Sequence, residues 1–269
     1  MDDYKNANRR LWNEWTSLHE GSAFYDVEGF KAGKVTLRSI ELAELGDVSG
    51  KSLLHLMCHF GLDTLSWARR GAAVTGVDLS DRSIALAASL SRELGIPATF
   101  LCSDVEHLPG ALSGEFDIVF SSYGVLHWLP DLDRWAEVIA HFLKPGGVFY
   151  LVEFHPFMRV FDTGSADLRA TEPYFYSPEP YRFEAKGSYA MPESDTEALP
   201  GYMWDHGIGE VVTAVVAAGL KIEYLHEFPY AVRAVFPNME QGKDGWWRLK
   251  ERHGVIPFLF SLRATKEAT

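Results

Sequence analysis

Short apolar runs alternate with longer segments of helical period from residue 52 onward. The runs predict strands at 52–57, 73–78, 98–102, 116–122 and 148–154, and helices are predicted between them at 62–71, 81–95 and 131–143. Gly71 and Gly95 end the first two helices, in keeping with the preference for glycine at a helix C-terminus. This alternation predicts a parallel sheet with helices on its faces.

The segments before and after this alternation differ from it. Helices are predicted at 6–19 and 33–46, joined by an aromatic connection that contains glycine. Residues 154–205 are rich in proline and aromatic side chains and exceed the length of an ordinary connection. We expect them to form a hairpin or an irregular lid, since long ordered insertions above a sheet often carry substrate specificity.

The C-terminal part returns to the α/β pattern. A helix is predicted at 206–220 with Asp205 as its N-cap, and strand-like runs follow at 221–230 and 258–266. The two runs fit antiparallel pairing at one edge of the sheet. The predicted fold class is α/β: a Rossmann-like, doubly wound sheet, mostly parallel with an antiparallel edge strand, plus N-terminal helices and a lid insertion.

Composition narrows the classes of partner. The 269 residues carry a net charge of -12, which repels nucleic-acid phosphates and anionic lipid, so neither nucleic acid nor a membrane is expected as a partner. No run approaches the roughly twenty apolar residues of a membrane span, and residues 1–10 lack the apolar core of a signal peptide, so a cytoplasmic protein is expected. Cys58 and Cys102 have no neighbours at metal-ligand spacing, which favours reduced thiols and predicts no metal site. The oligomeric state stays open.

Candidate ligand-binding residues follow the first two predicted strands, because open parallel sheets bind ligands beyond the carboxyl ends of their strands. Asp78 ends the second strand about twenty residues after the loop 57–61 begins, the spacing of a carboxylate that accepts hydrogen bonds from a ribose. A helix cap or turn residue is the structural alternative. A dinucleotide requires a glycine-rich loop around its pyrophosphate, whereas this loop has Gly61 alone. A nucleoside without phosphates, such as S-adenosylmethionine, fits better.

Five stretches of the chain, in order, carry a family resemblance: LLHLMCHFG, VTGVDLS, FLCSDVEHLP, FDIVFSSYGVLHWLPD and LKPGGVFYLVE. Residues 52–153 thereby resemble the core of the class I S-adenosylmethionine-dependent methyltransferases. The chain departs from the family pattern at His55, where an acidic residue is usual, and at Met57 and His59, where glycines are usual. We interpret the larger side chains as filling space left by a compact ligand; a loop that binds nothing is the alternative.

The resemblance implies S-adenosylmethionine as the cofactor and assigns residues to its parts. They are His59, Phe60 and Gly61 at the methionine part, Asp78 at the ribose, Leu79, Asp104 and Val105 at the adenine, Ser121 on the floor of the site, and Tyr25 folded over the cofactor. For Tyr25, an aromatic residue packed in a loop is the alternative.

Methyl transfer from a sulfonium is an in-line displacement that needs alignment and a deprotonated nucleophile. Histidine suits proton transfer near neutral pH. We predict His155, after the fifth strand, and His206, at the start of the helix that follows the lid, as a base or a substrate anchor. Tyr123, His127 and Glu153 are predicted to contact the substrate, although a histidine in the position of His127 commonly caps the following turn.

The expected function is S-adenosylmethionine-dependent methyl transfer to O, N or S of a small molecule. The aromatic lid suits a small, partly apolar or cationic acceptor, and equally an ordinary satellite core. A nicotinamide-dependent oxidoreductase on a similar sheet and a non-catalytic binding protein of this fold are the alternatives. We expect one domain over 1–269, with an N-terminal helical cap at 1–50, a cofactor-binding core at 51–153, a lid or substrate insertion at 154–205, and a C-terminal helix with edge strands at 206–269.

Overall fold

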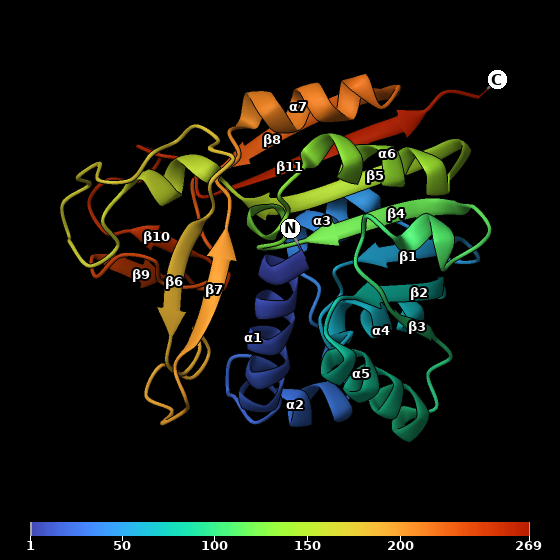
Figure 1. Cartoon of the computed structure of the whole chain (residues 1–269), viewed down its shortest axis with the longest axis horizontal. Coiled ribbons are helices and arrows are strands. Elements are labelled where there is room, and N and C mark those ends of the chain that lie inside the picture. The colour runs from blue at the N-terminus through green and yellow to red at the C-terminus, as the bar shows by residue number, and fades with distance from the viewer. Residues whose placement is uncertain (1, 269) are drawn as a thin grey trace.

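The computed structural model of the chain describes residues 2–268. Within these residues, a central sheet of seven strands has the order β3-β2-β1-β4-β5-β11-β8 (Figure 1). The strands are β1 (Ser52–Leu56), β2 (Ala73–Asp78), β3 (Thr99–Cys102), β4 (Phe116–Ser122), β5 (Leu143–Phe154), β8 (Leu220–Phe228) and β11 (Leu259–Lys266). β1 to β5 pair in parallel, and β11 is antiparallel to both β5 and β8, which confirms the predicted fold class. The strand order reverses between β1 and β4, where sheets of this kind bind ligands.

Helices cover both faces of the sheet because its strands are apolar on both sides. In β1, Leu54 packs in the cluster that includes Trp135 of α6 (Leu132–Phe142), together with side chains of α7 (Ile208–Ala217). Leu53, the preceding residue, points to the opposite face and packs with Trp67 of α4 (Leu62–Arg69) and with side chains of α3 (Ser39–Leu45). A further helix, α5 (Asp81–Leu94), lies beside β2 and β3.

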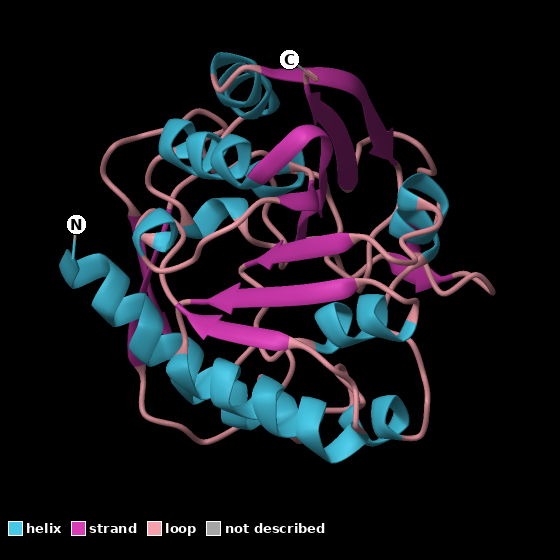
Figure 2. Ribbon diagram, turned by 90° about the vertical axis from the view of Figure 1, so that its right-hand side faces the viewer, coloured by secondary structure: helices cyan, strands magenta, loops and turns pink. Residues whose placement is uncertain are grey.

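A long N-terminal helix, α1 (Asp2–Glu20), crosses the carboxyl ends of the parallel strands (Figure 2). Its buried side chains include Asn8, Leu11, Trp15 and His19, which recur every three or four residues and so form one face of the helix. The Asn8 amide bonds both the N–H and the carbonyl oxygen of Tyr202, at 2.9 Å each. The helix is thereby tied to the hairpin of β6 (Tyr181–Ala185) and β7 (Leu199–Met203) that forms part of the 154–205 segment.

The prediction of one helix over 33–46 is wrong in its first half. α3 begins only at Ser39, because the Arg38 N–H donates to Glu41 Oε1 at 2.6 Å and fixes the start of the helix there. The preceding connection contains an unexpected short helix, α2 (Val27–Lys31), whose N-cap Asp26 accepts from the Gly29 N–H at 3.1 Å.

The remaining elements are short. They are the 3-10 helices η1 (Leu108–Gly110), η2 (Leu126–Trp128) and η3 (Pro156–Val160), and the strands β9 (Met239–Gln241) and β10 (Trp247–Leu249). β9 and β10 pair antiparallel and form a second hairpin. Over residues 2–268, no helix has the length and apolar character required to cross a bilayer.

Candidate active site

A cavity of about 820 Å³ lies at the carboxyl ends of β1, β2, β4 and β5, within the size range of small-molecule sites. Side chains from α1, the β6–β7 hairpin and the C-terminal segment complete its walls. All of the predicted site residues line this cavity except Ser121 and His155. Tertiary structure therefore brings together residues that lie as far apart in the chain as Tyr25 and His206.

The loop after β1 keeps a glycine-like backbone although it has few glycines. Met57 and His59 have φ of 58° and 52°, and Gly61 has φ of 76°. These angles lie in the left-handed region, which glycine enters freely and other residues enter at a cost. A Cβ on Gly61 would also lie 2.7 Å from the Phe100 ring, so this position has no room for a side chain.

The side chain of His59 ties the loop to two helices. Its Nε2 lies 2.8 Å from Nδ1 of His19 on α1, and its own Nδ1 lies 3.0 Å from Oγ of Ser83 on α5. Burial lowers the pKa of His59 well below its ordinary value, with His19 adding to the shift, so the ring is neutral near pH 7. Phe60 is also packed, in a cluster with Phe30 of α2. Both side chains occupy room that glycine would leave empty.

Asp78 keeps free acceptor capacity inside the cavity. Its Oδ2 accepts the His59 N–H at 2.7 Å, and its Oδ1 accepts the Ser80 N–H at 2.9 Å. Burial raises the pKa of Asp78 to about 6, and the backbone donors partly offset this effect. An ionised carboxylate has about four acceptor sites, so two backbone bonds leave acceptors for a ligand's hydroxyl groups.

Asp104 is more fully engaged than its predicted role requires. Its Oδ2 is 3.1 Å from Lys5 Nζ on α1 and 2.8 Å from His107 Nδ1, and its Oδ1 accepts the N–H groups of Glu106 and His107. Lys5 also pairs with Glu106 at 2.6 Å. A ligand's amino group would have to displace one of these partners, of which the His107 side chain is more exposed than that of Lys5.

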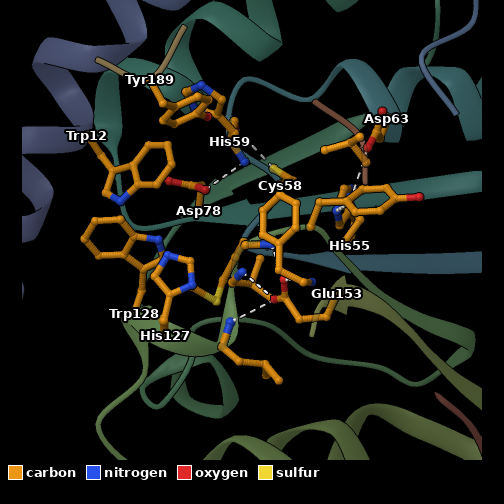
Figure 3. A pocket seen from close by; sticks show the side chains of 18 of the residues that line it. Trp12, His55, Cys58, His59, Asp63, Asp78, His127, Trp128, Glu153 and Tyr189 are labelled. Carbon is orange, nitrogen blue, oxygen red and sulfur yellow. Dashed lines mark hydrogen bonds between the residues drawn. The ribbon is translucent and has the colours of Figure 1, made fainter. Parts of the chain in front are cut away.

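Aromatic rings cover this part of the cavity, and among them only Tyr25 and His59 were predicted site residues. The Trp12 ring lies 5.1 Å from the His59 ring and 5.3 Å from the Trp128 ring (Figure 3). Tyr25 stacks on His19 at 4.9 Å, and its hydroxyl bonds the Tyr189 hydroxyl. The apolar face of α1 was visible in the sequence, but the element against which it packs was not.

Two residues predicted to contact the substrate, Glu153 and Tyr123, have side-chain oxygens that are hydrogen-bonded within the protein. Glu153, at the end of β5, accepts the backbone N–H groups of Gly124, Val125 and Leu126. Tyr123 donates its hydroxyl to Glu41 Oε2 at 2.8 Å. Glu153 therefore holds the connection between β4 and η2, which carries His127 and Trp128 into the cavity.

The structure separates the three candidate histidines. His155 lies outside the cavity, because its Nε2 faces Glu227 Oε1 at 2.8 Å and its Nδ1 accepts the Phe157 N–H at 3.1 Å. His206 lines the cavity, but its Nε2 is 2.7 Å from the Leu129 carbonyl oxygen. His127 also lines the cavity, and burial, aided by Arg159 and His206, lowers its pKa well below the ordinary value.

The last predicted residue outside the cavity is Ser121, a fully buried residue of β4. Asp63, in contrast, was not predicted and lines the cavity near the start of α4. Figure 3 shows it across the β1 loop from Asp78. Within residues 2–268, no three His, Cys, Asp or Glu side chains are grouped to hold a metal ion.

Known proteins resemble this chain in its central segment. Residues 54–151 match the family described as "Methyltransferase domain". A ubiquinone biosynthesis O-methyltransferase from Chromobacterium violaceum is 36% identical over 104 residues, which are 38% of this chain and 44% of that protein. The chain thus spans about half the length of the curated relatives it matches.

Solved structures extend the similarity to nearly the whole chain. An S-adenosylmethionine-dependent methyltransferase from Mesorhizobium loti has a TM-score of 0.56 at 20% identity, covering 92% of this chain and 99% of that one. One from Clostridium acetobutylicum has a TM-score of 0.58 at 12% identity, covering 96% and 99%. At these identities the structures establish the fold. The methyltransferase-domain match thus covers residues 54–151, and the chain as a whole has the fold of these S-adenosylmethionine-dependent methyltransferases.

Proposed function

We propose that this chain transfers the methyl group of S-adenosylmethionine to O, N or S of a small molecule. The observation that carries the proposal is Asp78: a carboxylate with free acceptors, at the end of β2 and inside a cavity of about 820 Å³. The β1 loop beside it follows a left-handed path at Met57, His59 and Gly61. A ribose at Asp78 would lie directly against this backbone.

The charges of the cavity support a ligand without phosphates. Its acidic side chains outnumber its basic ones, and they are Asp26, Asp63, Asp78, Asp104, Glu106, Glu153, Asp205 and Asp244, against Lys5, Lys34, Arg38, Arg159 and Arg233. Such a lining disfavours the pyrophosphate of a nicotinamide dinucleotide. It suits a nucleoside whose sulfonium and ammonium groups are positive. When bound, S-adenosylmethionine supplies an activated methyl group to a nucleophile aligned with its sulfur.

In this proposal, side chains of the protein exclude water from the reacting atoms and remove a proton from the methyl acceptor. Trp12 and Trp128 cover the cavity with apolar rings, and the β6–β7 hairpin encloses it further, so water is excluded from the reacting atoms. His127 is neutral because burial lowers its pKa, and a neutral imidazole accepts a proton from an acceptor hydroxyl or amine. We do not extend the base role to His155, which lies outside the cavity, or to His206, whose Nε2 is engaged.

Enclosure and charge support a small acceptor. The net charge of -12 disfavours nucleic acid, and side chains of both α1 and the β6–β7 hairpin line the cavity. We propose that residues 154–205 act as the lid over this acceptor. The free thiols Cys58 and Cys102 fit a reducing compartment, which supports a cytoplasmic location.

Calorimetry with S-adenosylhomocysteine, S-adenosylmethionine and NAD tests the proposal. We expect micromolar binding of the first two and no heat with NAD. Replacing Asp78→Ala should weaken binding of S-adenosylhomocysteine by about 1.5–3 kcal/mol, because the ribose hydroxyls lose a charged acceptor. The exposed Asp133→Ala is the matched control and should leave binding unchanged.

Four results would contradict parts of this proposal. Silence towards both sulfur nucleosides would refute it, and NAD binding would favour the oxidoreductase alternative. Unchanged affinity in a folded Asp78→Ala variant would remove Asp78 from the site. Nucleoside binding without transfer to any of a panel of phenols, amines and thiols would favour a non-catalytic protein.

A further inference from the structure

One end of the cavity, beyond the β1 loop, presents two opposite charges with no assigned role. We propose that Asp63 binds the ammonium group, and Arg38 the carboxylate group, of the amino-acid end of the bound nucleoside. This inference rests on the proposed function. It names the side chains that hold the amino-acid end of the nucleoside. The side chains of His59 and Phe60 in the loop do not explain this binding, because they pack against α1, α2 and α5.

The carboxylate of Asp63 has only neutral hydrogen-bond partners. Its Oδ1 accepts from Oγ1 of Thr36 at 2.5 Å, and its Oδ2 accepts from Oγ of Ser122 at 3.3 Å. Burial raises the pKa of Asp63, while the hydroxyl donors and Arg38 act in the opposite direction. A partly buried carboxylate in this state gains from a cation placed against it.

His55 of β1 stands where related proteins usually have an acidic residue, and it carries no negative charge. Its Nδ1 lies 2.8 Å from Oγ1 of Thr64, its side chain is buried, and burial lowers its pKa to about 3, so it is neutral. Its Nε2 lies 3.4 Å from Oγ of Ser122, the same hydroxyl that donates to Asp63. Asp63 therefore places a carboxylate beside the Ser122 hydroxyl, which the uncharged His55 also contacts.

Arg38 supplies the complementary charge. It lines the same cavity and is near enough to lower the pKa of Asp63, yet within residues 2–268 no carboxylate lies within ion-pair distance of its guanidinium. Its guanidinium lies over the Trp246 ring, with Cζ 5.4 Å from the ring centroid. Two opposite charges that line one cavity without pairing leave room for a zwitterion between them.

The order of the charged residues along the cavity also fits the ligand. Figure 3 shows Asp78 and Asp63 on opposite sides of the loop that carries Cys58 and His59. A nucleoside with its ribose at Asp78 would extend its amino-acid chain past this loop towards Asp63. All three charged residues line one continuous cavity.

A purely structural role is the competing explanation. Asp63 lies in the first turn of α4, where a carboxylate interacts favourably with the helix dipole, and Arg38 packs on Trp246. That explanation predicts lower stability in the variants and equal effects on all ligands. Ligand selectivity separates the two explanations.

Three nucleosides isolate each charge. S-adenosylhomocysteine carries both groups, 5′-(3-aminopropylthio)-5′-deoxyadenosine carries the amino group alone, and 5′-methylthioadenosine carries neither. We expect Asp63→Asn to weaken the first two by about tenfold or more and to leave the third within about twofold. Arg38→Gln should weaken S-adenosylhomocysteine alone by about tenfold. The exposed Asp47→Asn is the control and should change none of the three.

The outcomes are distinguishable. Equal losses for all three ligands, or no loss in folded variants, overturn the inference while the proposed function stands. If the wild type binds none of them, both fall. If the variants do not fold, the wild type decides alone: a preference of less than about threefold for S-adenosylhomocysteine over 5′-methylthioadenosine overturns the inference, and about tenfold or more supports it.

Discussion

At the scale of single residues, the loop after β1 shows how a glycine-poor sequence follows a glycine-like path. Met57 and His59 both have positive φ, at a cost of about 1–2 kcal/mol each relative to right-handed conformations. His59 offsets the cost through its contacts with His19 and Ser83. Met57 packs against the main cluster of buried side chains. The chain thus tolerates strain where side chains tie the loop down.

Met57 provides a direct test of this strain. Met57→Gly and Met57→Ala both remove the packed side chain, but only alanine retains a Cβ in the left-handed conformation. We expect the glycine variant to be more stable than the alanine variant by roughly 1 kcal/mol in urea unfolding. The reverse order is expected at Ala85, an exposed position in α5, where Ala85→Gly should destabilise by about 1 kcal/mol. A Met57→Ala variant as stable as Met57→Gly would show that the loop relaxes.

At the scale of elements, the connection between β4 and η2 depends on a carboxylate from the end of β5. Glu153 is almost fully buried and accepts three consecutive backbone N–H groups, from Gly124 to Leu126. Burial raises its pKa, and the backbone donors act in the opposite direction. The carboxylate replaces the backbone acceptors that these N–H groups lack at the end of the strand. Through it, the sheet fixes where His127 and Trp128 lie.

Glu153→Gln should therefore destabilise the protein through this connection. Glutamine keeps one acceptor oxygen and places an amide N–H₂ against backbone donors, so buried N–H groups lose their partner. We expect a loss of about 2–3 kcal/mol in the free energy of unfolding, measured in urea. Glu137→Gln, in an exposed pair with Arg134 on α6, should change it by less than about 0.5 kcal/mol. A Glu153→Gln variant of wild-type stability would mean that the connection is held by other contacts.

At the scale of the whole molecule, an acidic protein buries several carboxylates, some that line the cavity, such as Asp78, and some outside its lining, such as Glu41. Burial raises the pKa of Glu41 from 4.5 to about 7, and that of Asp78 from 3.8 to about 6. A carboxyl group with a raised pKa binds its proton more tightly in the folded state than in the unfolded state. Its contribution to stability is fully present below the unfolded pKa and is lost as the pH rises through the folded pKa.

Glu41 gives this effect a measurable sign. The Glu41→Gln variant keeps an acceptor oxygen for the Arg38 N–H, offers its amide N–H₂ as a donor to the Tyr123 hydroxyl oxygen, and does not ionise. Relative to this variant, the wild type should lose about 2–3 kcal/mol of unfolding free energy between pH 5 and pH 8, with the change centred below pH 7. Urea unfolding across this range measures the difference. The control Glu251→Gln, at an exposed site, should give a dependence of unfolding free energy on pH that is parallel to the wild type. If the difference in unfolding free energy between wild type and Glu41→Gln does not change with pH, the Glu41 carboxyl ionises as readily in the folded state as in the unfolded state.

The predicted fold agrees with the structure where the sequence pattern is strong. The five parallel strands and the helices between them were predicted within two residues, except that β5 begins at Leu143, five residues before its predicted start. The agreement arises because strands covered on both faces are apolar runs in the sequence. The helix predicted over 33–46 failed because a local side-chain bond from Glu41 decides where it begins. Periodicity alone does not register such a bond.

The candidate site was predictable where residues follow strand ends and not where they depend on packing. The sequence by itself determined the loop of Met57 to Gly61, Asp78 at the end of β2, and the order of elements that brings them together, since strand ends meet at one edge of a parallel sheet. Only the tertiary structure decided that α1 covers this edge, that Glu153 and His155 serve structural contacts, and that Asp63 lines the cavity. These facts depend on contacts between residues distant in the chain, and local pattern does not record which distant partner a polar side chain meets.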